Sequence, residues 1–179
     1  MNINNHFTAY RIIYPLLVLL VFTTLVGCGG ENEVIQVSDP SANEAVNLDI
    51  DLILELVNSH RAAGATCGTD NLSPASAVVW NDDLANAALD HSNDMEQNDY
   101  FSHTGLDGSS FSDRVARTDY SGNASGENIA WGYPNEGAVI QGWMESQGHC
   151  INIMNSNITE IGIARSDGGR YWTMVTGRS

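Results

Sequence analysis

The chain has 179 residues, enough for one domain with a hydrophobic core and a modest appendage but too few for two full domains. Its 22 acidic residues outnumber 7 basic ones, all arginine, and the net charge of -15 repels phosphate backbones and anionic headgroups. Nucleic-acid binding is therefore excluded as a function class. We interpret the excess of Asp and Glu first as a solvated surface suited to salty surroundings, and only second as a site that attracts cations.

The first 27 residues have the composition of an export signal. Arg11 is the only charged residue before Glu31, and the apolar run 12–26 is shorter than the roughly 20 residues of a membrane-spanning helix. The run ends in Leu-Val-Gly before Cys28, which resembles a bacterial lipobox. We interpret 1–27 as a lipoprotein signal peptide and Cys28 as the lipidated residue, with an uncleaved anchor helix as the alternative. Both place the domain outside the cytoplasm.

Residues 28–47 are predicted to be the lipidated cysteine and a flexible acidic tether, because they mix Gly, Asn, Ser, Pro and acid with few large apolar residues. Gly29 rather than an aspartate follows the cysteine, which resembles the pattern of outer-membrane sorting in cells with two membranes. The protein's first expected partner is thus a membrane, reached through the lipid. The globular domain is predicted over 48–179.

The remaining two cysteines are expected to form a disulfide. With Cys28 assigned to lipid, Cys67 and Cys150 are an even pair in an oxidising compartment, where a disulfide is the usual outcome. A thiol nucleophile at Cys150 is correspondingly disfavoured.

Apolar spacing and capping residues predict four helices in the domain. The stripe of the first fades near Gly64, and the second begins after the cap residue Asn81. Ser110 and Asp113 open a short third helix, and Asn135 precedes a fourth. The inward stripe of the second helix is Leu84, Ala87, Ala88, His91 and Met95. On this stripe the histidine is most simply a packed core residue.

Towards the C-terminus the apolar period changes to that of strands. The runs EIGIARS and RYWTMVTG flank Asp167-Gly168-Gly169, which predicts a β-hairpin with a tight turn. A further strand is predicted at GENIAW. Helices followed by a terminal hairpin indicate a mixed α and β layer structure.

Four scattered polar residues could carry chemistry, since the chain has no HExxH, GxSxG, Walker or Rossmann signature. They are His103, Glu127, Glu145 and His149. Two imidazoles with one or two carboxylates are the ligand types of a catalytic zinc site. Their spacing is non-local, so periodicity alone does not bring these side chains together, and the same residues also fit a buried hydrogen-bonded network that does no chemistry.

Five motifs in order, FSHTGLDGSSFSDRV, GENIAWG, GWMESQGHCINIM, EIGIA and YWTMVTG, resemble the CAP superfamily (SCP/PR-1/venom-allergen-like domains), in particular its secreted bacterial branch. The match runs from about Leu52 to Gly177. The resemblance implies an α+β fold, a three-layer α/β/α sandwich with an open cleft and a C-terminal β-hairpin. It also implies a histidine and glutamate cluster in the cleft, which in some members binds a divalent metal, often zinc.

The resemblance places His103, Glu127 and His149 at the family's two cleft histidines and its GEN glutamate. The family's fourth position falls on Ser146, whereas Glu145 lies one residue earlier. An offset of one residue turns a helical side chain by about 100°. Glu145 is therefore a further candidate whose orientation towards the cleft is open.

Three functions remain open from the sequence. The first is a lipid-anchored binding module whose cleft holds a small hydrophobic, peptide or cell-wall (glycan) ligand, with zinc or another divalent cation as a candidate cofactor. The second is a metal-assisted hydrolase in which His103 and His149 hold the cation and Glu127 is the candidate base. The third is a purely structural envelope protein. Whether the protein is an enzyme is left open, with a binding role favoured.

Overall fold

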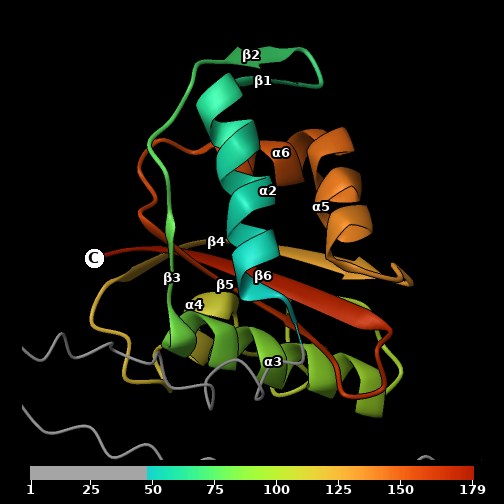
Figure 1. The fold of residues 1–179 in the computed structure, drawn as a ribbon. Helices are drawn as coiled ribbons and strands as arrows, with labels where there is room; N and C mark the ends of the chain where they lie inside the picture. The colour runs from blue at the N-terminus through green and yellow to red at the C-terminus, as the bar shows by residue number, and fades with distance from the viewer. Residues whose placement is uncertain (1–47) are drawn as a thin grey trace, which may run out of the picture. The chain divides into compact units, whose positions relative to one another are not determined.

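The computed structural model describes residues 48–179, the part coloured in Figure 1. The predicted signal peptide (1–27) and the predicted tether with its lipidated Cys28 (28–47) lie outside the described residues. Within 48–179, no helix has both the length and the apolar character needed to span a bilayer.

A four-stranded sheet forms the centre of the domain, in the order β3-β5-β6-β4. The strands are β3 (Val79–Trp80), β4 (Asn123–Trp131), β5 (Glu160–Arg165) and β6 (Tyr171–Arg178). β5 pairs antiparallel with β6 and β6 antiparallel with β4, while β3 adds in parallel to β5. The predicted C-terminal hairpin is therefore confirmed as β5 and β6. β4 lies at one edge of the sheet.

Helices cover both faces of this sheet, so the predicted α+β class and three-layer arrangement are confirmed (Figure 1). One face carries α2 (Ile50–Ala63), α5 (Glu136–Glu145) and α6 (Gln147–Met154) around a core that includes Trp143 and Trp172. The other carries α3 (Asp82–Gln97) and α4 (Phe111–Val115). The core thus lies in two layers, one on each side of the sheet.

The helices begin where capping side chains satisfy free backbone N–H groups. Asn81 accepts from Leu84 at the start of α3, and Asn135 accepts from Ala138 at the start of α5. Ser110 forms a reciprocal capping box with the residue three positions later at the start of α4. Each of these starts agrees with the sequence prediction, because a cap is a local signal that tertiary packing does not need to supply.

Besides the two-residue strand β3, two elements were not among the sequence predictions. They are α6 and a small hairpin made of β1 (Ala65–Cys67) and β2 (Asp70–Leu72). The disulfide between Cys67 and Cys150 joins them, with 5.5 Å between the two Cα atoms. The predicted pairing is therefore confirmed, and it attaches the β1–β2 hairpin to the helix that carries His149.

Candidate functional site

Glu127, a residue of β4, is the centre of a buried charged cluster on one face of that strand. Its side chain is almost fully buried, and each carboxylate oxygen has one cationic or imidazole partner. His103 Nδ1 lies 2.8 Å from Oε1, and Arg114 Nη2 lies 2.6 Å from Oε2. The sequence-predicted residues His103 and Glu127 are thus in direct contact, although 24 positions separate them.

Arg114 is a member of this cluster that the sequence analysis did not identify. It comes from α4 and is only 7% exposed. Its guanidinium also donates to the backbone carbonyls of Ser109, at 3.0 Å, and His103, at 3.2 Å. The side chain therefore ties together α4, the loop before it and β4. Its only sequence signal is an arginine in a short predicted helix, which by itself indicates an exposed position.

The contact with Glu127 defines how the His103 imidazole is presented. A carboxylate only accepts hydrogen bonds, so Nδ1 carries the proton and donates it to Glu127. Nε2 is the ring nitrogen directed away from Glu127, on a side chain that is 56% exposed. The buried carboxylate thus orients an imidazole at the surface.

Glu127 does not fit as a ligand to the divalent metal that the resemblance suggested. Both of its oxygens are already engaged, one of them by the Arg114 guanidinium, whose positive charge would repel a metal ion on the same carboxylate. Glu145 is exposed and accepts instead from Gln141 at 2.8 Å. Among residues 48–179, no group of three or more His, Cys, Asp or Glu side chains is arranged to hold a metal ion.

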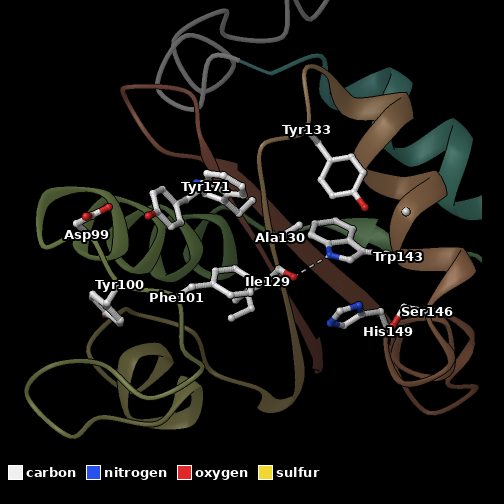
Figure 2. Close-up of a pocket in the computed structure, with 12 residues that line it drawn as sticks. Asp99, Tyr100, Phe101, Ile129, Ala130, Tyr133, Trp143, Ser146, His149 and Tyr171 are labelled. Carbon is white, nitrogen blue, oxygen red and sulfur yellow. Dashed lines mark hydrogen bonds between the residues drawn. The ribbon is translucent and has the colours of Figure 1, made fainter.

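A pocket of about 490 Å³ lies along the free edge of β4, and we call it the β4 pocket (Figure 2). Its size falls within the range of small-molecule sites. Its lining is Asp99, Tyr100, Phe101, Ile129, Ala130, Trp131, Tyr133, Gly142, Trp143, Ser146, His149 and Tyr171. Of the sequence-predicted residues only His149 is among them; His103 and Glu127 are not. Ser146, the position one after Glu145, also faces this pocket.

His149 is the titratable group at the α6 side of the β4 pocket. Burial lowers its pKa below the usual value of 6.5, and the nearby charge of His103 lowers the pKa further. The imidazole is therefore neutral at pH 7. Its backbone is fixed by Asn128, which donates to the His149 carbonyl at 3.1 Å. Asn152 donates to Asn128 in turn, so a pair of amides holds α6 against β4.

The walls of the β4 pocket are largely aromatic. Trp131 and Phe101 are 54% and 55% exposed, which is unusual for large aromatic side chains and marks an interaction surface. Arg170 lies over the Trp131 ring, 5.6 Å from its centroid. These residues come from three separate segments and share no periodic pattern, so only the fold brings them together.

The α/β/α sandwich and the order of its site residues define a CAP domain. The chain belongs to the cysteine-rich secretory protein (CAP) family, whose model matches residues 54–177.

Three similar proteins illustrate the relationship. The chain is 37% identical over 86 residues to the "Uncharacterized membrane protein YlbC" of Bacillus subtilis, covering 48% of this chain and 25% of the relative. It is 32% identical over 133 residues to the "Uncharacterized protein YkwD" of the same organism, covering 74% of this chain and 48% of the relative. A solved extracellular protein containing an SCP domain, from Bacillus anthracis, superposes with a TM-score of 0.65 at 27% identity, covering 80% of this chain and 44% of that one. The chain thus spans between a quarter and about half of their lengths.

Proposed function

We propose that the protein is an extracytoplasmic CAP-domain binding protein, anchored to the cell envelope by lipid on Cys28, that holds a small ligand by its apolar groups in the β4 pocket. The observation that carries this proposal is the pocket itself: about 490 Å³, mainly aromatic and aliphatic in its lining, with a few polar groups such as His149 and Ser146. Sites of this composition are typical of small-molecule binding.

Several observations support a location outside the cytoplasm. The Cys67–Cys150 disulfide is typical of oxidising compartments. The similar Bacillus anthracis protein is described as extracellular, and one Bacillus subtilis relative is named a membrane protein. The lipobox-like sequence before Cys28 adds the means of attachment.

The metal-assisted hydrolase receives less support. A general base must be free to accept a proton from its substrate. Glu127 is buried, and both of its oxygens already accept from Arg114 and His103. The purely structural role predicts that the β4 pocket binds nothing, so the same binding experiment separates it from the proposal.

The test of binding uses N-phenyl-1-naphthylamine, an uncharged apolar probe whose fluorescence rises when it leaves water. We expect saturable binding to the wild type and its loss in Ser146→Phe, which fills the pocket. Ser146 makes no side-chain cap bond to α6, so the substitution removes no cap contact. Ser59→Phe, at an exposed site on α2, is the matched control and should bind like the wild type. No saturable signal, or a signal unchanged in Ser146→Phe, would contradict the proposal.

The anchor is tested separately in a bacterial host by metabolic labelling with an alkyne fatty acid. We expect label on the wild type and none on Cys28→Ser. Equal labelling of the two proteins, or labelling of neither, would contradict lipidation at this residue.

A further inference from the structure

The outer edge of β4 presents backbone groups that the sheet does not use. Gly132 donates to the Arg170 carbonyl at 2.7 Å, and Ser166 donates to the Tyr171 carbonyl at 2.9 Å. In an antiparallel ladder the hydrogen-bonded pairs alternate. With the observed register, Asn128 and Ala130 therefore bond to β6, whereas the N–H and C=O groups of Glu127, Ile129 and Trp131 point away from it.

Two of these outward carbonyls already have side-chain partners. Asn152 donates to the Glu127 carbonyl at 3.2 Å, and Trp143 Nε1 donates to the Ile129 carbonyl at 3.3 Å (Figure 2). These two contacts confirm the direction that the ladder assigns to the odd-numbered residues. Within 48–179, no such partner is found for the N–H of Ile129 or for either backbone group of Trp131.

The β4 pocket lies at this unused stretch of the edge and has walls on both faces of the strand. Trp131 and Tyr171 are cross-strand neighbours and share one face with Ile129. Ala130 points to the opposite face, where Trp143 and His149 of α5 and α6 form the other wall (Figure 2). A chain lying along the edge would direct alternate side chains to these two walls, as successive residues of a strand do.

We propose that the β4 pocket binds an extended peptide segment that adds to β4 as an additional strand. This proposal rests on the proposed function and names the ligand class of the same pocket. Strand addition supplies main-chain hydrogen bonds for affinity and side-chain pockets for selectivity. An alkyl chain would expel water from the edge and leave the donors of Ile129 and Trp131 without partners, which is unfavourable for buried polar groups. A peptide backbone satisfies them.

The charge of the protein selects among peptides. The net charge is -15, and Asp99 lines the mouth of the β4 pocket. Acidic peptides are repelled by this field, so the segment bound is neutral or basic with apolar side chains at alternate positions.

The test is an N-methyl scan of a bound peptide. The probe is the tightest-binding acetylated, amidated hexapeptide from a random synthetic library screened against the full chain. Each of its backbone N–H groups is methylated in turn, and affinity is measured by calorimetry. Only alternate N–H groups of an added strand point to β4, so we expect losses of about tenfold or more with a period of two. Losses that do not alternate, or a library without a binder, would overturn strand addition.

A pair of variants tests the same contact from the protein side. Trp131→Pro removes the outward N–H together with the indole, whereas Trp131→Val removes only the indole. Proline is tolerated at edge strands when its missing N–H faces outward. We expect Trp131→Pro to bind the hexapeptide at least tenfold more weakly than Trp131→Val, and equal affinities would overturn the proposal. Because the N-methyl scan uses wild-type protein, poor folding of the proline variant does not remove the test.

The dye experiment distinguishes strand addition from the more general proposal that the β4 pocket binds a ligand. If N-phenyl-1-naphthylamine binds the β4 pocket while no peptide in the library does, strand addition is wrong and the proposed binding function stands. If neither binds, both are wrong.

Discussion

At the scale of residues, the most informative feature is the pairing of Glu127 with the Arg114 guanidinium, where the family resemblance suggested a metal cation. Glu127 is 5% exposed and Arg114 is 7% exposed, so each charge depends on the other for compensation. Arg114 also needs Glu127 because its remaining partners are neutral carbonyls and a hydroxyl. Removing either member of such a pair leaves an uncompensated buried charge.

We therefore expect Glu127→Gln to lower the free energy of unfolding by about 3 kcal/mol, because Arg114 is left buried without its carboxylate. Urea denaturation followed by circular dichroism measures this. Glu145→Gln makes the same chemical change at an exposed site and should stay within about 0.5 kcal/mol of the wild type. Equal stability of the two variants would show that the buried pair contributes little.

Sequence reasoning could single out His103, Glu127 and His149 as candidates because each lies in a recognisable motif. It could not show that Arg114 pairs with Glu127, because nothing in the residues next to Arg114, Asp113 and Val115, indicates a partner 13 positions away. Nor could it show that His103 and Glu127 are in direct contact while His149 lines the β4 pocket. These relations depend on the register of β4 and the packing of α4.

Buried His91 predicts how stability responds to acid. Nε2 lies 2.9 Å from the Ser102 carbonyl and donates to it, so Nδ1 is unprotonated, and it is buried without a partner among the described residues. Burial has the largest effect and lowers the pKa of His91. The charge of Glu127 raises this pKa and that of Arg114 lowers it, and the net shift is downward. Below pH 6.5 the unfolded chain takes up a proton that the folded ring does not. Stability is therefore full above this pH and decreases as pH falls towards the folded pKa.

We expect the free energy of unfolding to fall by up to about 1.4 kcal/mol per pH unit for this proton as pH drops below about 6.5. His149, whose pKa is also lowered by burial, acts in the same direction. Urea titrations between pH 7 and 5 should give a shallower slope for His91→Gln than for the wild type. Parallel slopes would contradict the assignment.

At the scale of elements, local signals account for what could be predicted. α3, α4 and α5 begin at the capping residues read from the sequence. α6 has no side-chain cap bond at Ser146, and a glycine, which disfavours helix, occupies its second position. The sequence therefore offers neither a capping signal nor a strong helix-forming residue at its start. β3 has two residues, and β1 and β2 have three each, lengths at which alternation cannot be recognised. These elements exist because the larger ones provide surfaces for them.

The crossing of α3 over β5 depends on Gly162. A Cβ built there would lie 2.0 Å from the Ala85 nitrogen and 2.4 Å from the Leu84 carbonyl carbon, both rigid backbone atoms. We expect Gly162→Ala to lower stability by more than about 2 kcal/mol, since overpacking must move the helix. Gly148→Ala in α6 meets no atom within 4 Å and should be neutral or raise stability by up to about 1 kcal/mol. Thermal unfolding of both variants tests this, and similar melting temperatures would contradict it.

The disulfide links β1 to α6 across a sequence separation of 83 residues. The chain-entropy account gives about 4.5 kcal/mol for closing such a loop in the unfolded chain, as an upper figure. We expect the double variant Cys67→Ala, Cys150→Ala to lose most of this, and the reduced wild type to unfold at a similar urea concentration. Two free thiols in the folded protein made in an oxidising compartment would contradict the linkage.

At the scale of the whole molecule, the order of five motifs predicted the architecture that the sheet and its two helix layers confirm. The β4 pocket could not be predicted in the same way. Its walls combine the segment after α3, the edge of β4, the turn before α5, α5 itself, the start of α6 and the first residue of β6. No sequence period relates these segments, and they meet only because β4 is the last strand of the sheet.

The charge of the whole chain makes stability depend on salt. The chain carries 22 acidic against 7 basic residues, and among residues 48–179 two arginine–carboxylate pairs form, one of which, Arg117–Asp107, is largely exposed. Most carboxylates therefore repel one another across the folded surface. Raising ionic strength from 0.01 to 1 M shortens the screening length from about 30 to about 3 Å. We expect the melting temperature to rise over this range in NaCl.

A variant with fewer carboxylates separates this screening from other effects of salt. Its four substitutions, all at exposed positions, are Glu55→Gln, Asp90→Asn, Asp119→Asn and Glu145→Gln. Because these changes reduce the repulsion that salt screens, the variant should melt at a higher temperature than the wild type at 0.01 M NaCl and converge with it at 1 M. Melting curves that stay parallel across the salt range would show that the excess acid does not destabilise the fold, and that it serves solubility alone.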